Sequence, residues 1–157
     1  MELIHIKNEL FMFEYCLEKQ RQIKEIFLTC PSEEAKYEKI IALGRQQPPL
    51  APAYKVANNL VKGCQSQMYL HSYWSGNAII FEAESDALIS AGLASLLTQV
   101  YSGETPEVIL KCPPTYLDEL GISASLTPNR ASGLYSVHLR MKQEALKLLV
   151  DRESKHK

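Results

Sequence analysis

Residues 67–84, QMYLHSYW-SGN-AIIFEAE, decide the fold of this chain. Residues 67–74 and 78–84 are rich in β-branched and aromatic side chains, which favour strands. Ser75-Gly76-Asn77 lies between them and supplies the permissive backbone that a tight turn requires. The stretch therefore predicts a β-hairpin. A third short strand is expected just before it, over residues 56–61.

The residues before the hairpin predict two helices and a connector. Apolar residues recur at helical spacing over residues 8–28, and a second helix is expected from an N-cap at Ser32 to a stop at Gly44. Three prolines within residues 48–52 then prevent a helix, because proline removes a backbone donor and extends its neighbour. The hairpin is therefore preceded by a helical segment of about 40 residues.

The residues after the hairpin predict more helix. Ser85 or Asp86 can cap a strongly apolar helix that ends at Gly103. Two short helices follow, at residues 105–111 and 114–120. A long helix starts at Thr127-Pro128, and its polar end, residues 151–157, is expected to fray.

This order predicts an α+β fold in which a small antiparallel sheet of about three strands is flanked by N-terminal and C-terminal helices. With 157 residues, the chain is expected to form a single domain over residues 1–157.

Composition excludes several broad functions. There are 17 Lys and Arg residues against 18 Asp and Glu, so the net charge of -1 gives no positive field for nucleic acid. No apolar run approaches the roughly 20 residues that a membrane-spanning helix needs. Residues 1–7 lack the features of a signal or transit peptide. The chain is expected to be soluble and cytoplasmic, as a monomer or a homodimer.

The four cysteines, Cys16, Cys30, Cys64 and Cys112, show no zinc-site or C-x-x-C spacing, and no metal site is expected. Cys64 differs from the other three because Gly63 precedes it and polar residues follow it. A reactive cysteine needs access and a group that lowers its pKa, and Lys62 is two residues away. The alternative is that Cys64 is a small buried hydrophobe at the start of a strand.

Other candidates have ordinary structural explanations. His71 could act as a base, but a lone strand histidine is more often a structural residue. Glu84 and Asp86 could form a carboxylate pair, although capping explains Asp86. Arg130 lies in the first turn of a helix, where the dipole disfavours a cation, so it is a candidate for pairing with a carboxylate of this chain or of a partner.

Two motifs together resemble the SufE family of sulfur-acceptor proteins. They are V-K-G-C-Q-S-Q at residues 61–67 and L-T-P-N-R-A-S-G-L at residues 126–134. The resemblance covers roughly residues 20–145.

The resemblance implies an α+β fold shared with IscU-type scaffolds and a role in iron-sulfur cluster assembly. It implies that Cys64 accepts sulfur as a persulfide from a SufS-type cysteine desulfurase, stimulates that enzyme and passes the sulfur to a downstream scaffold complex. The pyridoxal phosphate belongs to the desulfurase, so no cofactor is expected on this chain. Gly63, Gln65, Ser66 and Arg130 are the expected partner-binding residues.

Persulfide transfer is chemically similar to thiol-disulfide exchange, for which one acceptor thiol is enough. An iron-sulfur scaffold generally needs about four ligands, and Cys16, Cys30 and Cys112 lie on other predicted elements. A scaffold and a non-catalytic desulfurase-binding adaptor remain as alternatives, and whether the chain has enzymatic activity of its own stays open. Because persulfides are easily lost to other thiols, we expect Cys64 to lie on a loop that apolar residues partly cover and that swings out on docking.

Overall fold

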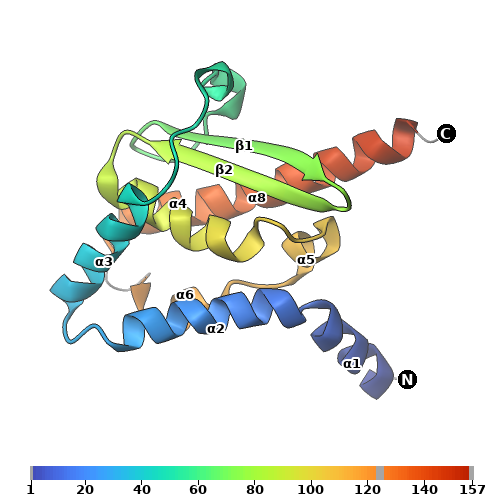
Figure 1. Cartoon of the computed structure of the whole chain (residues 1–157), viewed down its shortest axis with the longest axis horizontal. Coiled ribbons are helices and arrows are strands. Elements are labelled where there is room, and N and C mark those ends of the chain that lie inside the picture. Colours follow the sequence, from blue (N-terminus) through green and yellow to red (C-terminus); the bar gives the residue numbers. More distant parts are fainter. Residues whose placement is uncertain (1, 123–125, 156–157) are drawn as a thin grey trace.

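A computed structural model describes residues 2–122 and 126–155. Its hairpin is antiparallel, with Ser75 paired to Ala78 across a turn at Gly76, whose φ is +62°. The α+β class is confirmed, and Figure 1 shows two long helices running alongside the hairpin. The elements are α1 (Glu2–Met12), α2 (Glu14–Leu28), α3 (Glu33–Arg45), β1 (Met68–Ser75), β2 (Ala78–Ser85), α4 (Leu88–Tyr101), α5 (Pro106–Lys111), α6 (Thr115–Glu119) and α8 (Pro128–Lys155).

The described sheet has two strands, so the expected third strand over residues 56–61 is wrong. Ala57–Asn59 form a 3-10 turn, and Leu60 contributes a single bridge to Tyr69. The side chain of Arg140 on α8 donates to the carbonyl oxygens of Leu60, at 2.9 Å, and of Asn58. These carbonyls therefore bind an arginine where a strand would need them for pairing.

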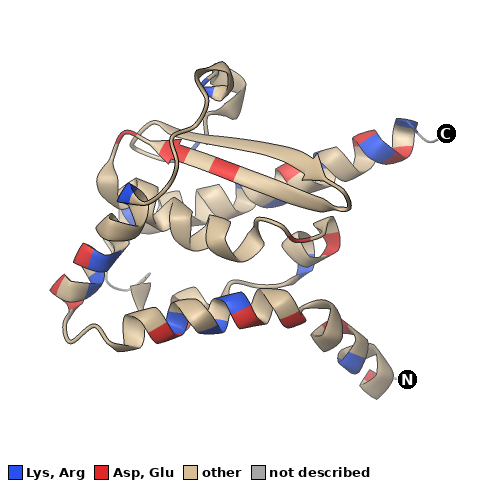
Figure 2. Cartoon of the chain, viewed as in Figure 1, with Lys and Arg blue, Asp and Glu red and all other residues tan. Residues whose placement is uncertain are grey.

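α4 forms the centre of the core. It carries no charged residue, as Figure 2 shows, and most of its side chains are buried, including Leu96 and Leu97, which are fully covered. β2 packs on one side of it and α3 crosses another. Gly92 permits that crossing, because a Cβ there would lie 2.0 Å from the carbonyl oxygen of Ile40. Gly44 of α3 also lies in close contact, since a Cβ there would lie 2.6 Å from the Gly92 nitrogen.

Several predicted helix boundaries differ from the structure. The helix expected over residues 8–28 is two helices, α1 and α2, which meet at Phe13. α3 continues one residue past Gly44, whose role is close packing. α8 continues to Lys155, with Arg152 stacked on Trp74 at 3.6 Å and donating to the Gly76 carbonyl at 3.0 Å, and the fraying of the tail stays a prediction. Residues 156–157 lie outside the described part.

α1 extends away from the body of the molecule (Figure 1). None of its residues is buried, and Phe11 is 78% exposed. The first helix therefore adds little to the core. Within the described ranges, no helix is long and apolar enough to cross a membrane.

Candidate functional site

Cys64 lies on a short loop that connects the 3-10 turn to β1. The backbone N–H of Val61 donates to the Met68 carbonyl at 2.8 Å and closes the loop at its base. Gly63 has φ +94°, a region that disfavours every residue with a side chain. A Cβ at Gly63 would also lie 2.4 Å from the Ser136 hydroxyl on α8. Glycine is therefore needed here for both the backbone turn and the close approach to α8.

The second half of the loop is held by Ser85 at the end of β2 and by Asp86, which follows it. Asp86 accepts a hydrogen bond from the Gln67 backbone N–H at 3.0 Å and donates its own N–H to the Gln67 carbonyl at 3.3 Å. The Ser85 hydroxyl donates to the Ser66 hydroxyl at 3.3 Å. Asp86 thus fixes the loop and does not form a catalytic pair with Glu84, which binds Lys55 and the Leu50 N–H.

The Cys64 side chain lines a cavity of about 160 Å³ between the loop, α4 and α8. Its sulfur lies 3.7 Å from the carbonyl oxygen of Gly133. The cavity has an apolar and a polar part, and the polar part includes exposed side chains: Met68, Ala87, Ile89, Leu93, Leu134 and Val137 form the apolar part, and Gln65, Ser66, Ser90, Asn129 and Arg130 the polar part. The structure therefore shows the partial apolar cover that we expected for Cys64.

Burial raises the pKa of the Cys64 thiol. No cation among the described residues offsets this effect, so the expectation that Lys62 would lower that pKa is wrong. Lys62 is exposed, as a long charged side chain next to solvent usually is. In this position the thiol is protonated at neutral pH and is a weak nucleophile, because the thiolate is the reactive form.

The structure brings four of the five predicted site residues to one cavity. Cys64, Gln65, Ser66 and Arg130 all line it, and Gly63 lies beside it. The Arg130 guanidinium lies over the ring of Tyr37 on α3, 6.0 Å from its centre, and its pairing with a carboxylate of a partner stays a prediction.

Sequence reasoning missed Gly133 and Ser136, the α8 residues against which the loop rests. A Cβ at Gly133 would lie 3.8 Å from the Cys64 sulfur, an ordinary contact distance. A glycine inside a long helix is unfavourable, which is a sign that a neighbour packs closely there. The sequence contains no comparable sign for Ser136.

The other candidate residues lie elsewhere. The ring of His71 stacks on Tyr54 at 3.6 Å, a structural role. Cys16 and Cys112 are buried together in the core, and Cys30 is half-buried after α2. Among residues 2–122 and 126–155, no three His, Cys, Asp or Glu side chains gather in a group that could hold a metal ion.

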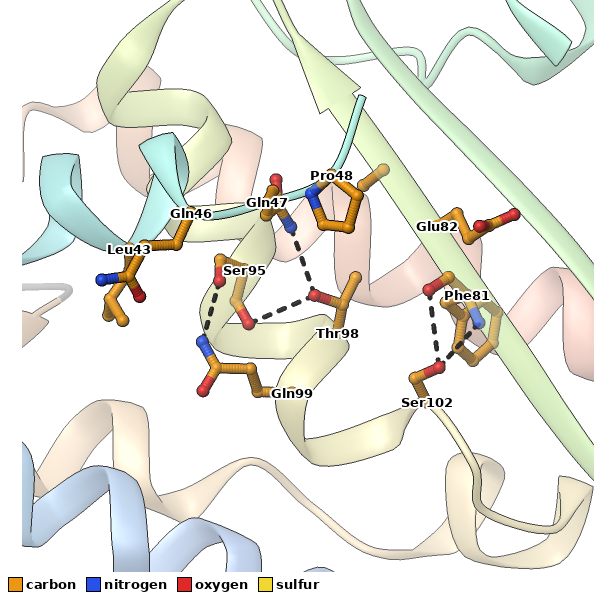
Figure 3. A pocket seen from close by; sticks show the side chains of 11 residues that line it. Leu43, Gln46, Gln47, Pro48, Phe81, Glu82, Ser95, Thr98, Gln99 and Ser102 are labelled. Atoms are coloured by element: carbon orange, nitrogen blue, oxygen red, sulfur yellow. Dashed lines mark hydrogen bonds between the residues drawn. The ribbon is translucent and has the colours of Figure 1, made fainter. Parts of the chain in front are cut away.

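A second cavity, drawn in Figure 3, lies against another part of α4, since Ser95, Thr98 and Gln99 line it whereas Ile89, Ser90 and Leu93 line the Cys64 cavity. Its volume is about 360 Å³, and it is lined by Leu43, Gln46, Gln47, Pro48, Phe81, Glu82, Ala83, Ser95, Thr98, Gln99 and Ser102. Its polar groups largely bind one another: Gln99 donates to the Ser95 hydroxyl at 2.8 Å, and Gln47 donates to the Thr98 hydroxyl at 3.3 Å. The described residues that line it include no thiol and no basic side chain.

Comparisons with known proteins agree with the motifs. The SufE family model, described as an Fe-S metabolism associated domain, matches residues 21–145. SufE-like protein 1, chloroplastic/mitochondrial, of Arabidopsis thaliana is 33% identical over 86% of this chain, which spans only 37% of that relative's length. An uncharacterized SufE-like protein of Synechocystis is 32% identical over 80% of this chain and 79% of its own.

A solved structure supports the same fold. The solution structure of a hypothetical protein from Thermus thermophilus matches with a TM-score of 0.70 and 27% sequence identity. The match covers 84% of this chain and 96% of that one. The chain therefore belongs to the SufE family, whose domain is associated with iron-sulfur metabolism.

Proposed function

We propose that this chain is a sulfur acceptor that takes persulfide sulfur onto Cys64 from a SufS-type cysteine desulfurase and passes it on for iron-sulfur cluster assembly. The observation that carries the proposal is the setting of Cys64. It is a single thiol in a partly apolar cavity, on a loop joined to the body through Gly63 and a few contacts. Such a site can hide a bound sulfur atom and release it to one partner at a time.

The chemical step needs only this thiol and the donor persulfide. The Cys64 thiolate attacks the outer sulfur of the donor persulfide, a new S–S bond forms on Cys64, and the donor cysteine leaves as a thiolate. The proton of the Cys64 thiol passes to solvent or to the donor thiolate. Pyridoxal phosphate acts earlier, on the desulfurase, in generating the donor persulfide.

The cavity also regulates this step. Because burial raises the Cys64 pKa, the resting thiol is poorly reactive towards stray electrophiles. When the loop leaves the cavity on docking, the desolvation is lost and the pKa falls towards its ordinary value. Gln65, Ser66 and Arg130 in its polar part are the groups that a docked partner would meet first.

The two alternatives have less support. A cluster scaffold needs several ligands, whereas the buried Cys16 and Cys112 thiols lie outside the group of residues that lines the Cys64 cavity. An adaptor that acts by contact alone gives no reason for a thiol at the centre of the cavity. The cytoplasmic location stays a prediction, since the Arabidopsis relative is named for chloroplasts and mitochondria.

The test incubates the chain with a SufS-type desulfurase and free cysteine, and then weighs the intact protein. We expect one extra sulfur atom on the wild type, removable by a reductant, and none on Cys64→Ser. Cys30→Ser is the matched control because Cys30 is also half-buried, and it should gain sulfur normally.

Each alternative predicts a different result. Sulfur uptake by Cys64→Ser would show that Cys64 is not the sulfur acceptor. Full stimulation of the desulfurase by Cys64→Ser would support the adaptor instead. A stable chromophore after anaerobic reconstitution with iron and sulfide, lost in Cys64→Ser, would support the scaffold.

A further inference from the structure

Outside the Cys64 cavity, we propose that Cys16 and Cys112 form a modification site, a buried dithiol that hydrogen peroxide closes to an intramolecular disulfide. The bond would tie the start of α2 to the segment between α5 and α6. This inference does not depend on the proposed sulfur-acceptor function, because it involves neither Cys64 nor a partner protein.

The two sulfurs share one hydrogen-bond donor. The side-chain nitrogen of Gln20 lies 3.7 Å from the sulfur of Cys16 and 3.7 Å from the sulfur of Cys112. The same nitrogen donates to the carbonyl of Pro113 at 3.1 Å, which holds it between α2 and the segment after α5. The sulfurs are thus gathered around a single nitrogen atom, although they lie on segments far apart in the sequence.

The backbone around the pair is also fixed. The hydroxyl of Tyr101 donates to the Cys112 carbonyl at 2.7 Å. Cys16 is 0% and Cys112 is 2% exposed, so no thiol from another molecule reaches them in the folded state. An intramolecular bond is therefore favoured over mixed disulfides.

The two thiols differ in acidity. A hydrogen bond from the Cys112 thiol, more than any other contact, lowers the pKa of Cys16, and the same bond raises the pKa of Cys112. The charged groups that act on the pair are Glu104 and Lys19, which form an ion pair at 2.8 Å and so largely offset each other. Cys16 is therefore the thiol that reacts first.

A small oxidant can reach Cys16 through the beginning of α2. Cys16 is the third residue of that helix, and Phe13 at its N-cap makes no capping hydrogen bond. The preceding α1 buries no residue. Transient local opening at this end, next to the exposed α1, would give hydrogen peroxide access to the buried Cys16.

The reaction balances without a further reactant. The Cys16 thiolate attacks one oxygen of hydrogen peroxide, the O–O bond breaks, and a sulfenic acid and water form. The sulfur of Cys112 then attacks the sulfenic sulfur, the S–O bond breaks, and a second water leaves. The two thiols lose two electrons and two protons, and the peroxide is reduced to two waters.

The test uses the Cys30→Ser/Cys64→Ser double variant, which keeps only the two core thiols and changes no fully buried residue. After treatment with hydrogen peroxide, the protein is denatured and labelled with N-ethylmaleimide. We expect a monomer about 2 Da lighter than the starting protein, with no label, and full labelling after dithiothreitol. The bond closes a long loop, so the melting temperature should rise by roughly 10 °C and fall again on reduction.

Other outcomes overturn the proposal. Two labels after oxidation would mean that the thiols do not react, and a gain of oxygen without cross-linking would mean that they oxidise separately. A covalent dimer would mean that the bond is intermolecular. Adding Cys112→Ala to the double variant is the control, and it should abolish the change in melting temperature.

Discussion

The two cavities, which different residues of α4 line, differ in the chemistry of their side chains and not only in volume. The larger, about 360 Å³, is lined by amide and hydroxyl groups that bind one another (Figure 3). The smaller, about 160 Å³, contains a thiol with a raised pKa beside a glycine at positive φ. Chemistry and local strain, rather than volume, therefore mark the candidate site.

The two cavities are also lined by different elements of the fold. α3 and the residues just after it line the larger cavity, whereas α8 contributes only to the smaller one. Changes in α3 packing should therefore act on the larger cavity, and changes in α8 or the loop should act on Cys64. Four predictions test this separation.

The largest effect is expected from Gly92→Ala. The new Cβ would meet the backbone carbonyl of Ile40 at 2.0 Å, and a backbone group cannot rotate away. α3 must then move off α4, which should lower the free energy of unfolding by about 3 kcal/mol or more in urea titrations. Leu88→Ala, at a half-exposed position of the same helix, should cost under about 1 kcal/mol. Equal losses for the two variants would contradict the close crossing.

The next effect is a loss of stability at low pH, caused by protonation of His138 on α8. Burial lowers the pKa of His138 to about 4, below the ordinary value of about 6.5 for an unfolded chain. As the pH falls, the unfolded state therefore binds the proton first. The contribution of neutral His138 to the free energy of unfolding is fully present above about pH 6.5 and is lost as the pH falls towards 4, by about 3 kcal/mol in total.

The measurement is unfolding by urea at several values of pH. His138→Phe keeps an aromatic ring against Tyr101, whose ring centre lies 5.2 Å away, and removes the titration, so its stability should change less between about pH 6.5 and 4. The same pH dependence in both proteins would show that another group is responsible.

A smaller but more specific effect is expected from Gly63→Ala. In the seated state the Cys64 loop rests against α8, and in the open state it has left the cavity. The substitution strains only the seated state, through φ +94° at residue 63 and the contact with Ser136. A penalty of about 1.4 kcal/mol on the seated state makes the open state about tenfold more populated. Cys64 should therefore react about tenfold faster with iodoacetamide at about pH 7.5.

Gly76→Ala is the matched control for this experiment. Gly76 also has positive φ, at +62°, but a Cβ there would have no neighbour within 4 Å, and the turn lies at the other end of β1 from the Cys64 loop. It should lose a similar stability of about 1 kcal/mol and leave the alkylation rate within about twofold. Faster alkylation in both variants would mean that general loosening, not the loop, exposes the thiol.

The smallest effect is expected in the larger cavity. The side-chain oxygen of Gln47 is buried without a partner in the described structure. Gln47→Met removes this oxygen together with the hydrogen bond to the Thr98 hydroxyl, so the two effects oppose each other and the stability should stay within about 1 kcal/mol. Sulfur uptake by Cys64 should not change. A clear loss of sulfur uptake would show that the larger cavity influences Cys64 and would contradict the separation of the two cavities.

The sequence by itself determined the features that depend on neighbouring residues. The hairpin follows from strand-forming residues around Gly76, the buried α4 from a run of apolar residues, and the family from the motifs around Cys64 and Arg130. Local backbone preferences and local motifs suffice for these.

Only the tertiary structure decided the environment of Cys64. Its pKa is raised by burial, and the sulfur lies against α8, where Gly133 and Ser136 are about 70 residues away in the sequence. Likewise, the bonds from Arg140 to residues 58 and 60 replaced the third strand. Desolvation and hydrogen-bond competition depend on which surfaces meet, and distance along the chain does not reveal this.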